Sequence, residues 1–303
     1  MIKNIAICII TYKRPIFLRK CIISILNQKL DFDLYIIDND HNASAKRVVE
    51  FMQHDTSSKL NYILEKKKGI PYARNKAVEC VKDKYKYLVF IDDDEEADKM
   101  WLINLYNAIK KYNVDVIAGP VLPIIENKFF KIADSGAFFR KEKKYINGQI
   151  MNTCATSNVI IKMDVFQKYP KPFNEKFKNT GGTDTFFFEK IIQDGFIIKW
   201  CNDAIVYERY EDDRLTLKFN FMRSYRIGNS KAFGLKLRKK YFKILFKIII
   251  SILELCISIP LIILTLIAYL MQYKKPFILI IKHIMRTVGF CNGILGYRYE
   301  DYK

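Results

Sequence analysis

Three consecutive carboxylates, Asp92-Asp93-Asp94, directly follow an apolar run over residues 87–91. Such a run is typical of a strand buried on both faces of a parallel sheet, so the acids stand at the strand's carboxyl end. Adjacent like charges repel one another unless a cation or hydrogen-bond donors compensate them. Oxygen ligands from one or two carboxylates, completed by substrate phosphates, are typical of a Mg²⁺ or Mn²⁺ site. The triplet therefore indicates a divalent-metal site, and a solvated acidic turn that continues through the next two glutamates is the alternative.

Other polar and charged residues stand at the ends of predicted elements. Four of them have a purely structural interpretation: a strand-end turn for the aspartate–asparagine pair, an exposed helix position for the second arginine, and a helix cap for the last aspartate. The residues at these ends are Thr11, Tyr12 and Arg14 after the first strand, Asp38 and Asn39 after the second, Arg74 near the start of a helix, and Asp184 beside another.

Short β-branched runs alternate with helical patterns from Ile5 to Tyr207, which is typical of βαβ units that build a parallel sheet. The stretch 119–153 shows no pattern regular enough to predict an element. Strands are expected at residues 5–11, 34–37, 61–64, 87–91, 114–118 and near 157, and helices from Pro15, from Pro71, over 99–112 and over 185–193, with Thr183 or Asp184 as the cap of the last.

Lysine and arginine outnumber aspartate and glutamate by 51 to 32, a net charge of +19 over 303 residues. That excess suits an anionic partner, such as acidic lipid head groups, a phosphorylated substrate or nucleic acid. The sequence has no recognisable nucleic-acid-binding module, and much of the excess lysine lies near an apolar C-terminal segment. We therefore expect anionic membrane lipids as a partner, and no nucleic acid.

The sequence lacks the residues that several other kinds of site require. The seven cysteines are scattered without a Cys-x-x-Cys spacing, and only three histidines exist, so zinc sites, disulfide frameworks and histidine-based triads are not indicated. No glycine-rich dinucleotide or P-loop motif is present. The apolar run at residues 5–10 is shorter than a signal-peptide core and leads into Lys13 and Arg14, so we expect the N-terminal part to stay in the cytoplasm.

Residues 248–271 form an apolar stretch with one charge, Glu254. At about 1.5 Å per residue this stretch is long enough to cross a hydrocarbon layer of ~30 Å. Pro260 and a polar stripe interrupt it, and lysines flank both ends, so one simple crossing would leave a basic cluster on the wrong side. A re-entrant hairpin or a helix lying in the interface keeps both clusters cytoplasmic, and a buried helix of a soluble bundle is the alternative.

Five motifs follow one another along most of about the first 230 residues. They are residues 7–15 (Ile-Cys-Ile-Ile-Thr-Tyr-Lys-Arg-Pro), Ile37-Asp38-Asn39, Gly69 with Ala73-Arg74-Asn75, Phe90-Ile91-Asp92-Asp93-Asp94, and Gly181-Gly182-Thr183-Asp184. In order and spacing they resemble the family 2 inverting glycosyltransferases. The resemblance implies a GT-A fold, that is, an α/β Rossmann-like and mainly parallel sheet flanked by helices, over residues 1–235. Residues 236–303 then form a hydrophobic, membrane-associated helical tail.

Carried over position by position, the resemblance assigns a role to each candidate residue. Asp38 would accept a hydrogen bond from a uracil-type N–H, which favours a UDP-sugar donor. Asp184 matches the general base that deprotonates the acceptor hydroxyl. The family commonly has Glu-Asp there, and Thr183-Asp184 keeps the base but removes its neighbour. The nucleotide sugar would lie against Thr11, Tyr12, Arg14, Asp38, Asn39, Arg74, Asp92 and Asp93, with Mn²⁺ or Mg²⁺ on Asp92 and Asp94.

Residues 206–228 resemble a subgroup that builds bacterial surface polysaccharides. Arg223 and Arg226 are three residues apart and would share a helix face, where they either contact a donor or acceptor phosphate or form a solvated basic face. The Gln-x-x-Arg-Trp motif of processive synthases is missing, which favours the transfer of a single sugar.

These features together predict an enzyme that moves one sugar from a nucleotide-diphosphate donor to a hydroxyl of a lipid-linked saccharide acceptor. The expected location is the cytoplasmic face of the plasma membrane. The alternative is a catalytically silent nucleotide-sugar-binding scaffold at the membrane, because a fold does not guarantee activity.

Overall fold

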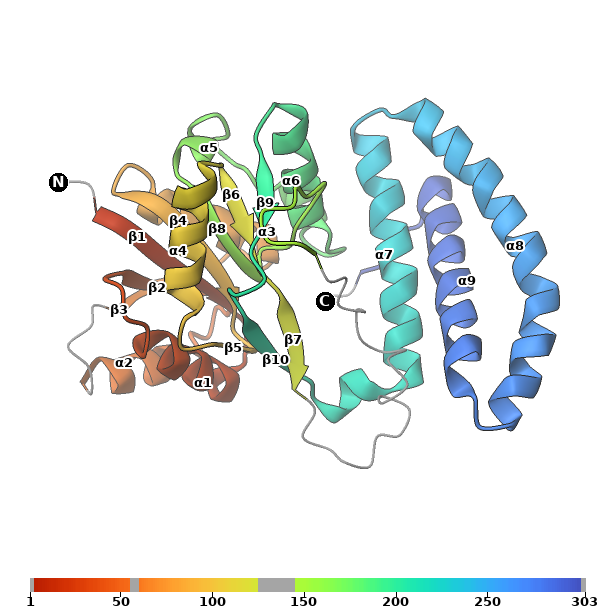
Figure 1. The fold of residues 1–303 in the computed structure, drawn as a ribbon, viewed down its shortest axis with the longest axis horizontal. Helices are drawn as coiled ribbons and strands as arrows, with labels where there is room; N and C mark the ends of the chain where they lie inside the picture. The colour runs from red at the N-terminus through yellow and green to blue at the C-terminus, as the bar shows by residue number, and fades with distance from the viewer. Residues whose placement is uncertain (1–2, 55–59, 125–144, 301–303) are drawn as a thin grey trace. The chain divides into compact units, whose positions relative to one another are not determined.

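A seven-stranded sheet is the centre of the computed structural model, which describes residues 3–54, 60–124 and 145–300 (Figure 1). The predicted strands are confirmed, and neighbouring strands pair in parallel except at β8, which is antiparallel to both of its neighbours. The order across the sheet is β3 (Leu60–Leu64), β2 (Asp33–Asp38), β1 (Lys3–Thr11), β4 (Tyr85–Asp92), β8 (Asn158–Lys162), β6 (Val116–Ala118) and β9 (Ile198–Trp200).

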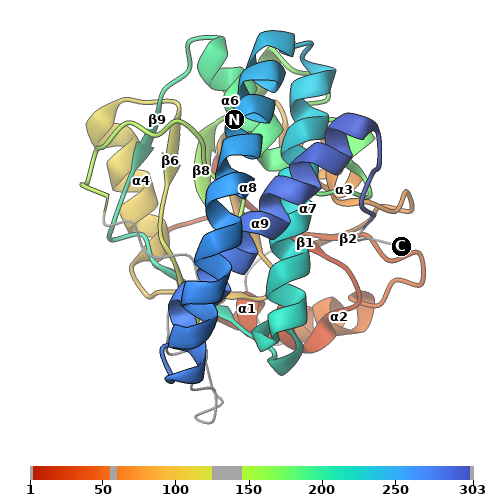
Figure 2. The ribbon, with the colours of Figure 1, turned by 90° about the vertical axis from the view of Figure 1, so that its right-hand side faces the viewer.

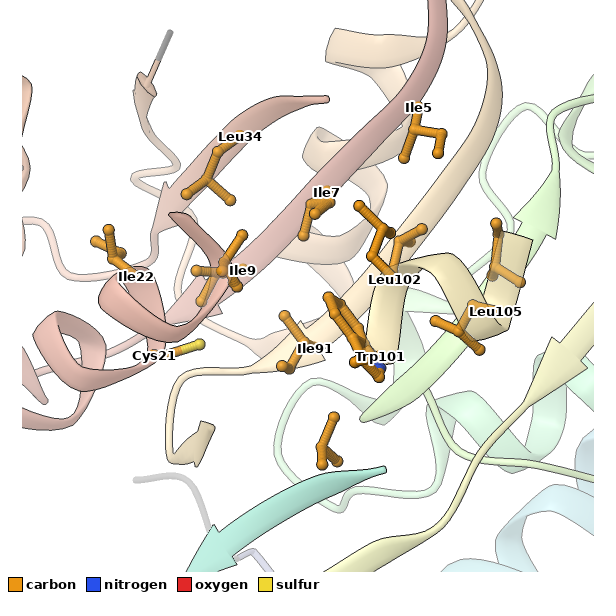
Figure 3. Packing of buried hydrophobic residues seen from close by; sticks show 14 of the residues in the cluster. Ile5, Ile7, Ile9, Cys21, Ile22, Leu34, Ile91, Trp101, Leu102 and Leu105 are labelled. Atoms are coloured by element: carbon orange, nitrogen blue, oxygen red, sulfur yellow. The ribbon is translucent and has the colours of Figure 1, made fainter. Parts of the chain in front are cut away.

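Helices cover both faces of this sheet, which is why its strands are apolar on both sides. In β1 the side chains of Ile5, Ile7 and Ile9 join one buried cluster and those of Ala6 and Cys8 the other. Figure 3 shows the first cluster, in which Cys21, Ile22, Trp101, Leu102 and Leu105 lie beside the strand residues. That cluster includes α1 (Pro15–Leu26), α2 (Lys46–His54) and α4 (Trp101–Tyr112), and the other includes α3 (Ile70–Val81), α5 (Asp164–Gln167) and α6 (Thr183–Gln193).

A second, small sheet continues directly from the acidic triplet. Its strands are β5 (Glu95–Ala97), β10 (Val206–Arg209) and β7 (Val121–Ile124), with β10 in the middle. The backbone of Asp94 accepts a hydrogen bond from the N–H of Arg209 at 3.2 Å. The triplet therefore connects two sheets and is held at both ends. Of the stretch without a predicted element, residues 125–144 lie outside the described part.

The chain divides into two units. The N-terminal unit comprises Met1–Ile124, Lys144–Lys178 and Thr183–Arg209 and contains both sheets, and η2 (Glu175–Phe177) lies in it. The C-terminal unit comprises Ile125–Lys143, Asn179–Gly182 and Tyr210–Lys303. The predicted division into a catalytic domain over 1–235 and a tail over 236–303 stays a prediction.

The C-terminal unit is helical: a short η3 (Asp212–Leu215) precedes α7 (Leu217–Leu237), α8 (Tyr241–Leu270) and α9 (Lys274–Leu295). Figures 1 and 2 show α9 against both other long helices. The backbones of α7 and α9 approach so closely that a Cβ added to Gly228 would lie 1.9 Å from the carbonyl oxygen of Arg286. A Cβ added to Gly289 would lie 2.0 Å from the carbonyl oxygen of Tyr225. Small residues permit this kind of close helix contact.

The apolar segment predicted at 248–271 falls inside α8 except for its last residue, Met271, and the helix is bent by 48° between Ser258 and Pro260. The residues read from sequence as its basic C-terminal flank start another long helix, α9. By length and composition α9 could cross a bilayer, and the bent α8 would add a second crossing if its two halves count together. The tail is therefore a helical hairpin rather than one apolar helix with a polar flank.

Candidate active site

The carboxyl ends of three adjacent strands bring the N-terminal candidates to one edge of the sheet. In the parallel register Thr11 of β1 lies opposite Asp38 of β2, and Ile10 lies opposite Asp92 of β4. Parallel strands end at the same edge, and ligands of open α/β sheets bind beyond such ends. The structure therefore places Thr11, Asp38 and Asp92 side by side at this edge.

The acidic turn is compensated by donors from β1 and the residues that follow it. The Thr11 hydroxyl donates to Asp93 Oδ2 at 2.7 Å. The Arg14 guanidinium donates to Asp94 Oδ2 at 2.8 Å and lies 3.4 Å from Asp93 Oδ1. Asp93 is 6% exposed and Glu95, whose carboxylate accepts the Asp92 N–H at 3.0 Å, is 2% exposed. The alternative of a solvated acidic turn is therefore wrong.

Burial and mutual repulsion make these carboxyl groups hard to ionise. Burial raises the pKa of Asp92 to about 7, against the opposing effect of Arg74, and Asp94 and Asp93 raise it further. Burial, followed by the charge of Asp94, raises the pKa of Asp93 to about 6, although Arg14 and Thr11 lower it. The pKa of Glu95 is raised well above its ordinary value by burial and then by Asp92. A neighbouring cation would stabilise the ionised forms.

The donor set fits a hard divalent ion. Its ligands would be carboxylate oxygens at partly exposed Asp92 and Asp94, on either side of a buried Asp93. In the described ranges no three His, Cys, Asp or Glu side chains are grouped closely enough to hold an ion by themselves. Mg²⁺ and similar ions commonly use one or two carboxylates and take their other ligands from water and phosphate. The site therefore suits an ion that arrives with a phosphorylated substrate.

Without such an ion, the contribution of Asp92 to the free energy of unfolding should fall as pH rises from about 4 to 7. The raised pKa of Asp92 means that the folded protein keeps a proton that the unfolded chain releases above its ordinary value of 3.8. Stability from the protonated group is thus complete below pH ~4 and is lost as pH passes about 7. The Asp92→Asn variant lacks this titration and should be more stable than wild type at pH 7.5 by on the order of 2–4 kcal/mol, with little difference at pH 4.

Urea unfolding of both proteins in EDTA at the two pH values measures this difference. Asp98→Asn, which changes another acid of the same region, is the matched control. An Asp92→Asn effect that is the same at both pH values would contradict the assignment of the titration to Asp92.

Arg74 is the second arginine whose charge acts on the acidic turn. It is 8% exposed, its charge acts on Asp92, and its guanidinium stacks 5.6 Å from the centre of the Phe173 ring. Asn75, the next residue after Arg74, holds the backbone of Phe173. Its side chain donates to the Phe173 carbonyl at 2.8 Å and accepts the Phe173 N–H at 2.9 Å. A planar guanidinium held in this way is suited to binding phosphate oxygens.

Asp38 and Asn39 are both committed to hydrogen bonds within the protein. Asp38 is fully buried and accepts from the N–H groups of Asp40 and Ala45 and from the Tyr62 hydroxyl, at 2.9–3.0 Å. Asn39 donates to the carbonyls of Glu65 and Lys67 and accepts the Gly69 N–H. These bonds fix the two loops beyond β2 and β3. Whether the pair also contacts a nucleotide stays a prediction.

Tyr12 stands where these loops meet, and the sequence prediction missed its surroundings. The ring is 37% exposed and has two ammonium groups near it, Lys13 Nζ at 5.3 Å and Lys68 Nζ at 5.4 Å from its centre. The basic run at residues 66–68 was a visible signal, but only the Asn39 bonds show that this run is fixed beside β1. The edge is thus lined by cations as well as acids.

Asp184 lies in the first turn of α6 and is partly exposed. Its Oδ1 accepts the N–H of Thr185 at 2.9 Å. The helix begins at Thr183 itself, so the prediction that Thr183 or Asp184 caps it is wrong, because both residues lie within its first turn. Within the described residues the buried Thr183 hydroxyl has no hydrogen-bond partner. Burial and then the charge of Asp184 raise the pKa of the Cys154 thiol, which shows that this carboxylate faces the segment before β8.

Arg223 and Arg226 both lie on α7 and are partly exposed, in the C-terminal unit. The helix predicted for them is confirmed. Their role as phosphate contacts stays a prediction.

Comparison with known proteins adds three kinds of similarity. Residues 6–170, more than half of the chain, match the model of a family described as glycosyl transferase family 2. The chain is 26% identical over 245 residues to the succinoglycan biosynthesis protein ExoM of Rhizobium meliloti, covering 77% of each protein. It is also 26% identical over 152 residues to the glycosyltransferase GlyA of Streptococcus pneumoniae, covering 48% of this chain and 21% of GlyA.

Among solved structures, S. aureus TarS residues 1–349 superimpose with a TM-score of 0.56 at 14% sequence identity, covering 74% of this chain and 65% of that one. The same TarS fragment in complex with UDP-GlcNAc gives a TM-score of 0.55 at 12% identity, covering 74% and 66%. The chain thus spans about two thirds of the TarS fragment. At these identities the likeness concerns the fold.

Proposed function

Because the chain belongs to glycosyl transferase family 2, we propose that it transfers a single sugar, with inversion, from a nucleotide-diphosphate donor to a hydroxyl of a lipid-linked saccharide. Family membership and the fold confirm the GT-A-like α/β architecture and the prediction of a transferase enzyme. The donor, acceptor, stereochemistry, location and residue roles below are proposals.

The acidic turn and its two arginines are the observation that carries the proposal. Asp92 and Asp94 would hold Mn²⁺ or Mg²⁺. Arg14 bonds to Asp94 and the charge of Arg74 acts on Asp92, so a diphosphate at the turn could accept hydrogen bonds from both guanidinium groups. The ion, when bound, supplies positive charge to the departing diphosphate. The arginines add directed hydrogen bonds to the same oxygens, where negative charge develops during transfer.

Asp184 would complete the reaction as general base. Its carboxylate removes the proton of the acceptor hydroxyl while that oxygen forms a bond to the anomeric carbon, and the bond to the diphosphate oxygen breaks on the opposite face. One displacement of this kind inverts the configuration. The partly exposed position of Asp184 at the start of α6 leaves it accessible to an acceptor.

A UDP-sugar is the favoured donor. The support is the fold shared with TarS, whose fragment has been solved with UDP-GlcNAc and with UDP. Thr11, Tyr12, Asp38 and Asn39 would line the nucleotide, with Asp38 and Asn39 shaping the loops around it.

Surface-polysaccharide synthesis at the cytoplasmic face of the plasma membrane is the proposed setting. The name of ExoM supports a role in building a polysaccharide. A net charge of +19 and a strongly apolar α8 support a membrane rich in anionic lipid. An acceptor anchored in that membrane would explain why a transferase carries such a helix.

Thermal unfolding with UDP, UDP-GlcNAc and GDP, each with Mn²⁺ or EDTA, tests the donor class. A ligand that binds only the folded state raises the melting temperature by mass action. We expect a rise of several degrees with a uridine nucleotide and Mn²⁺ together, and much less with either alone. No rise with any nucleotide would remove the proposed donor.

Replacing Asn39 by alanine should weaken UDP binding about tenfold while changing turnover at saturating donor by less than threefold. The variant loses the three hydrogen bonds that hold residues 65–69 beside Tyr12, so the loop must be ordered by the ligand. Isothermal titration with UDP and Mn²⁺ measures the change. Asn61→Ala, which loses one hydrogen bond to Leu34 on the same side of the sheet, is the control, and equal UDP affinities for the two variants would contradict the prediction.

A further inference from the structure

One face of α8 is apolar, continuous and exposed. Six large side chains on it are each at least half exposed, and they recur at intervals of one, three and four residues, which places them along one side of a helix. A contiguous apolar patch of this size marks an interaction surface. The six are Leu245, Phe246, Ile249, Ile252, Leu253 and Ile257.

The polar residues of α8 point the other way, toward α9. Ser251 and Ser258 are buried, and Glu254 between them accepts two hydrogen bonds from Lys247 Nζ at 3.0 Å. The same carboxylate lies 3.5 Å from the Thr287 hydroxyl and 3.6 Å from His283 Nε2, both on α9. The single acid of the apolar segment is thus compensated inside the hairpin and does not interrupt the outer face.

The α7–α9 contact opposes a crossing of the bilayer by this hairpin. α9 carries Lys282 and Arg286 near its middle, and its glycines hold its backbone against α7, which carries Arg223 and Arg226. Moving α9 through the hydrocarbon would bring these charges with it, and a charged side chain near the bilayer centre is costly. The length and composition of α9 would let it span a membrane, but its packing against α7 opposes this.

The lysines at both ends of α8 indicate which partner fits its outer face. Lys239, Lys240 and Lys243 stand at its start, and Lys274 and Lys275 follow its end. A second copy of the chain on this face would bring lysines against lysines in either orientation. An anionic bilayer instead satisfies the apolar middle and both basic ends at once.

We propose that the α8–α9 hairpin docks on an anionic bilayer through the outer face of α8, which sinks into the interface without crossing it. The inference deepens the proposed membrane location by naming the helix face and the depth. It does not depend on the identity of the sugar.

Flotation with vesicles tests the docking. We expect the full-length protein to bind vesicles of phosphatidylcholine with phosphatidylglycerol, and to bind phosphatidylcholine alone much more weakly. The double variant Leu253→Asp, Ile257→Asp should bind at least 100-fold more weakly. Ile23→Asp with Ile150→Asp adds the same charge at exposed apolar positions of the N-terminal unit and should leave binding unchanged. Since all four positions are exposed, circular dichroism should show native helix content.

Labelling of the α8–α9 turn tests the depth. Tyr273→Cys places a thiol in this exposed turn, and Cys256→Ser removes the exposed native thiol of α8. We expect a membrane-impermeant maleimide added outside intact vesicles to label the thiol introduced by Tyr273→Cys as fast as after detergent lysis, with the Cys256→Ser protein as background. Labelling only after lysis would show that the hairpin crosses the bilayer, and would overturn the proposal.

One further result would also overturn it: no binding to anionic vesicles. Self-association that Leu253→Asp and Ile257→Asp abolish would then assign the face of α8 to a second copy of the chain. UDP binding measured without vesicles keeps the two proposals apart. A protein that binds UDP with Mn²⁺ but not vesicles loses only the docking, and one that binds vesicles but no nucleotide loses only the proposed donor.

Discussion

Replacing Asp184 by asparagine is expected to lower the turnover number for sugar transfer by a factor of about 10²–10⁴, the usual contribution of a positioned general base. The amide is nearly isosteric and its oxygen can still accept the Thr185 N–H, so α6 should remain folded. What the amide cannot do is take a proton from the acceptor. Donor affinity should stay within twofold, because the proposed nucleotide contacts lie on other elements.

Initial rates over a range of donor concentrations, with titration of UDP, separate these two effects. Asp164→Asn, which changes the acid in the first turn of α5 in the same unit, is the control and should retain near-normal turnover. A loss of UDP affinity equal to the loss of turnover would assign Asp184 to donor binding. Unchanged turnover in Asp184→Asn would remove it as the base.

Most of the sheet could be predicted because burial leaves a direct trace in sequence. β1, β2 and β4 are apolar runs that end in polar residues, and parallel pairing brings those ends to one edge, so Thr11, Asp38 and Asp92 could be placed together. The direction of β8 could not be predicted. A run of buried β-branched residues reads the same whether a strand is parallel or antiparallel to its neighbours.

The side-chain roles at this edge were less accessible to sequence. Asn39 looks like a loop residue, yet its side chain bonds to backbone groups of the loop that follows another strand, β3. In the C-terminal unit the basic residues of α9 look like the flank of the apolar segment. For this reason the sequence did not predict a second long helix there, whose glycines pack on α7. Such contacts join residues far apart in the chain and leave no periodicity.

The second large effect is expected from the acidic turn. Asp92→Asn combined with Asp94→Asn should lower turnover by at least 100-fold and remove the gain in UDP affinity that Mn²⁺ or Mg²⁺ gives wild type. Four acids from Asp92 to Glu95 lie together with Glu208 near them, and the cations acting on Asp92 and Asp93 are Arg74 and Arg14. A diphosphate adds negative charge to this cluster, so donor binding should require an ion that its ligands can hold.

Removing the ion from wild type should reproduce the variant. We expect UDP to bind at least tenfold more weakly in EDTA than in Mn²⁺, and the doubly substituted protein to bind UDP equally in both. Asp98→Asn, whose amide can still accept the Met100 N–H at the start of α4, should keep the full Mn²⁺ dependence and so controls for a changed charge near the turn. If wild type binds UDP as tightly in EDTA as in Mn²⁺, Arg14 and Arg74 alone must neutralise the diphosphate, and the metal is then no part of donor binding. If the double variant instead keeps the Mn²⁺ gain, the ion is held by other groups, and Asp92 and Asp94 lose their proposed role.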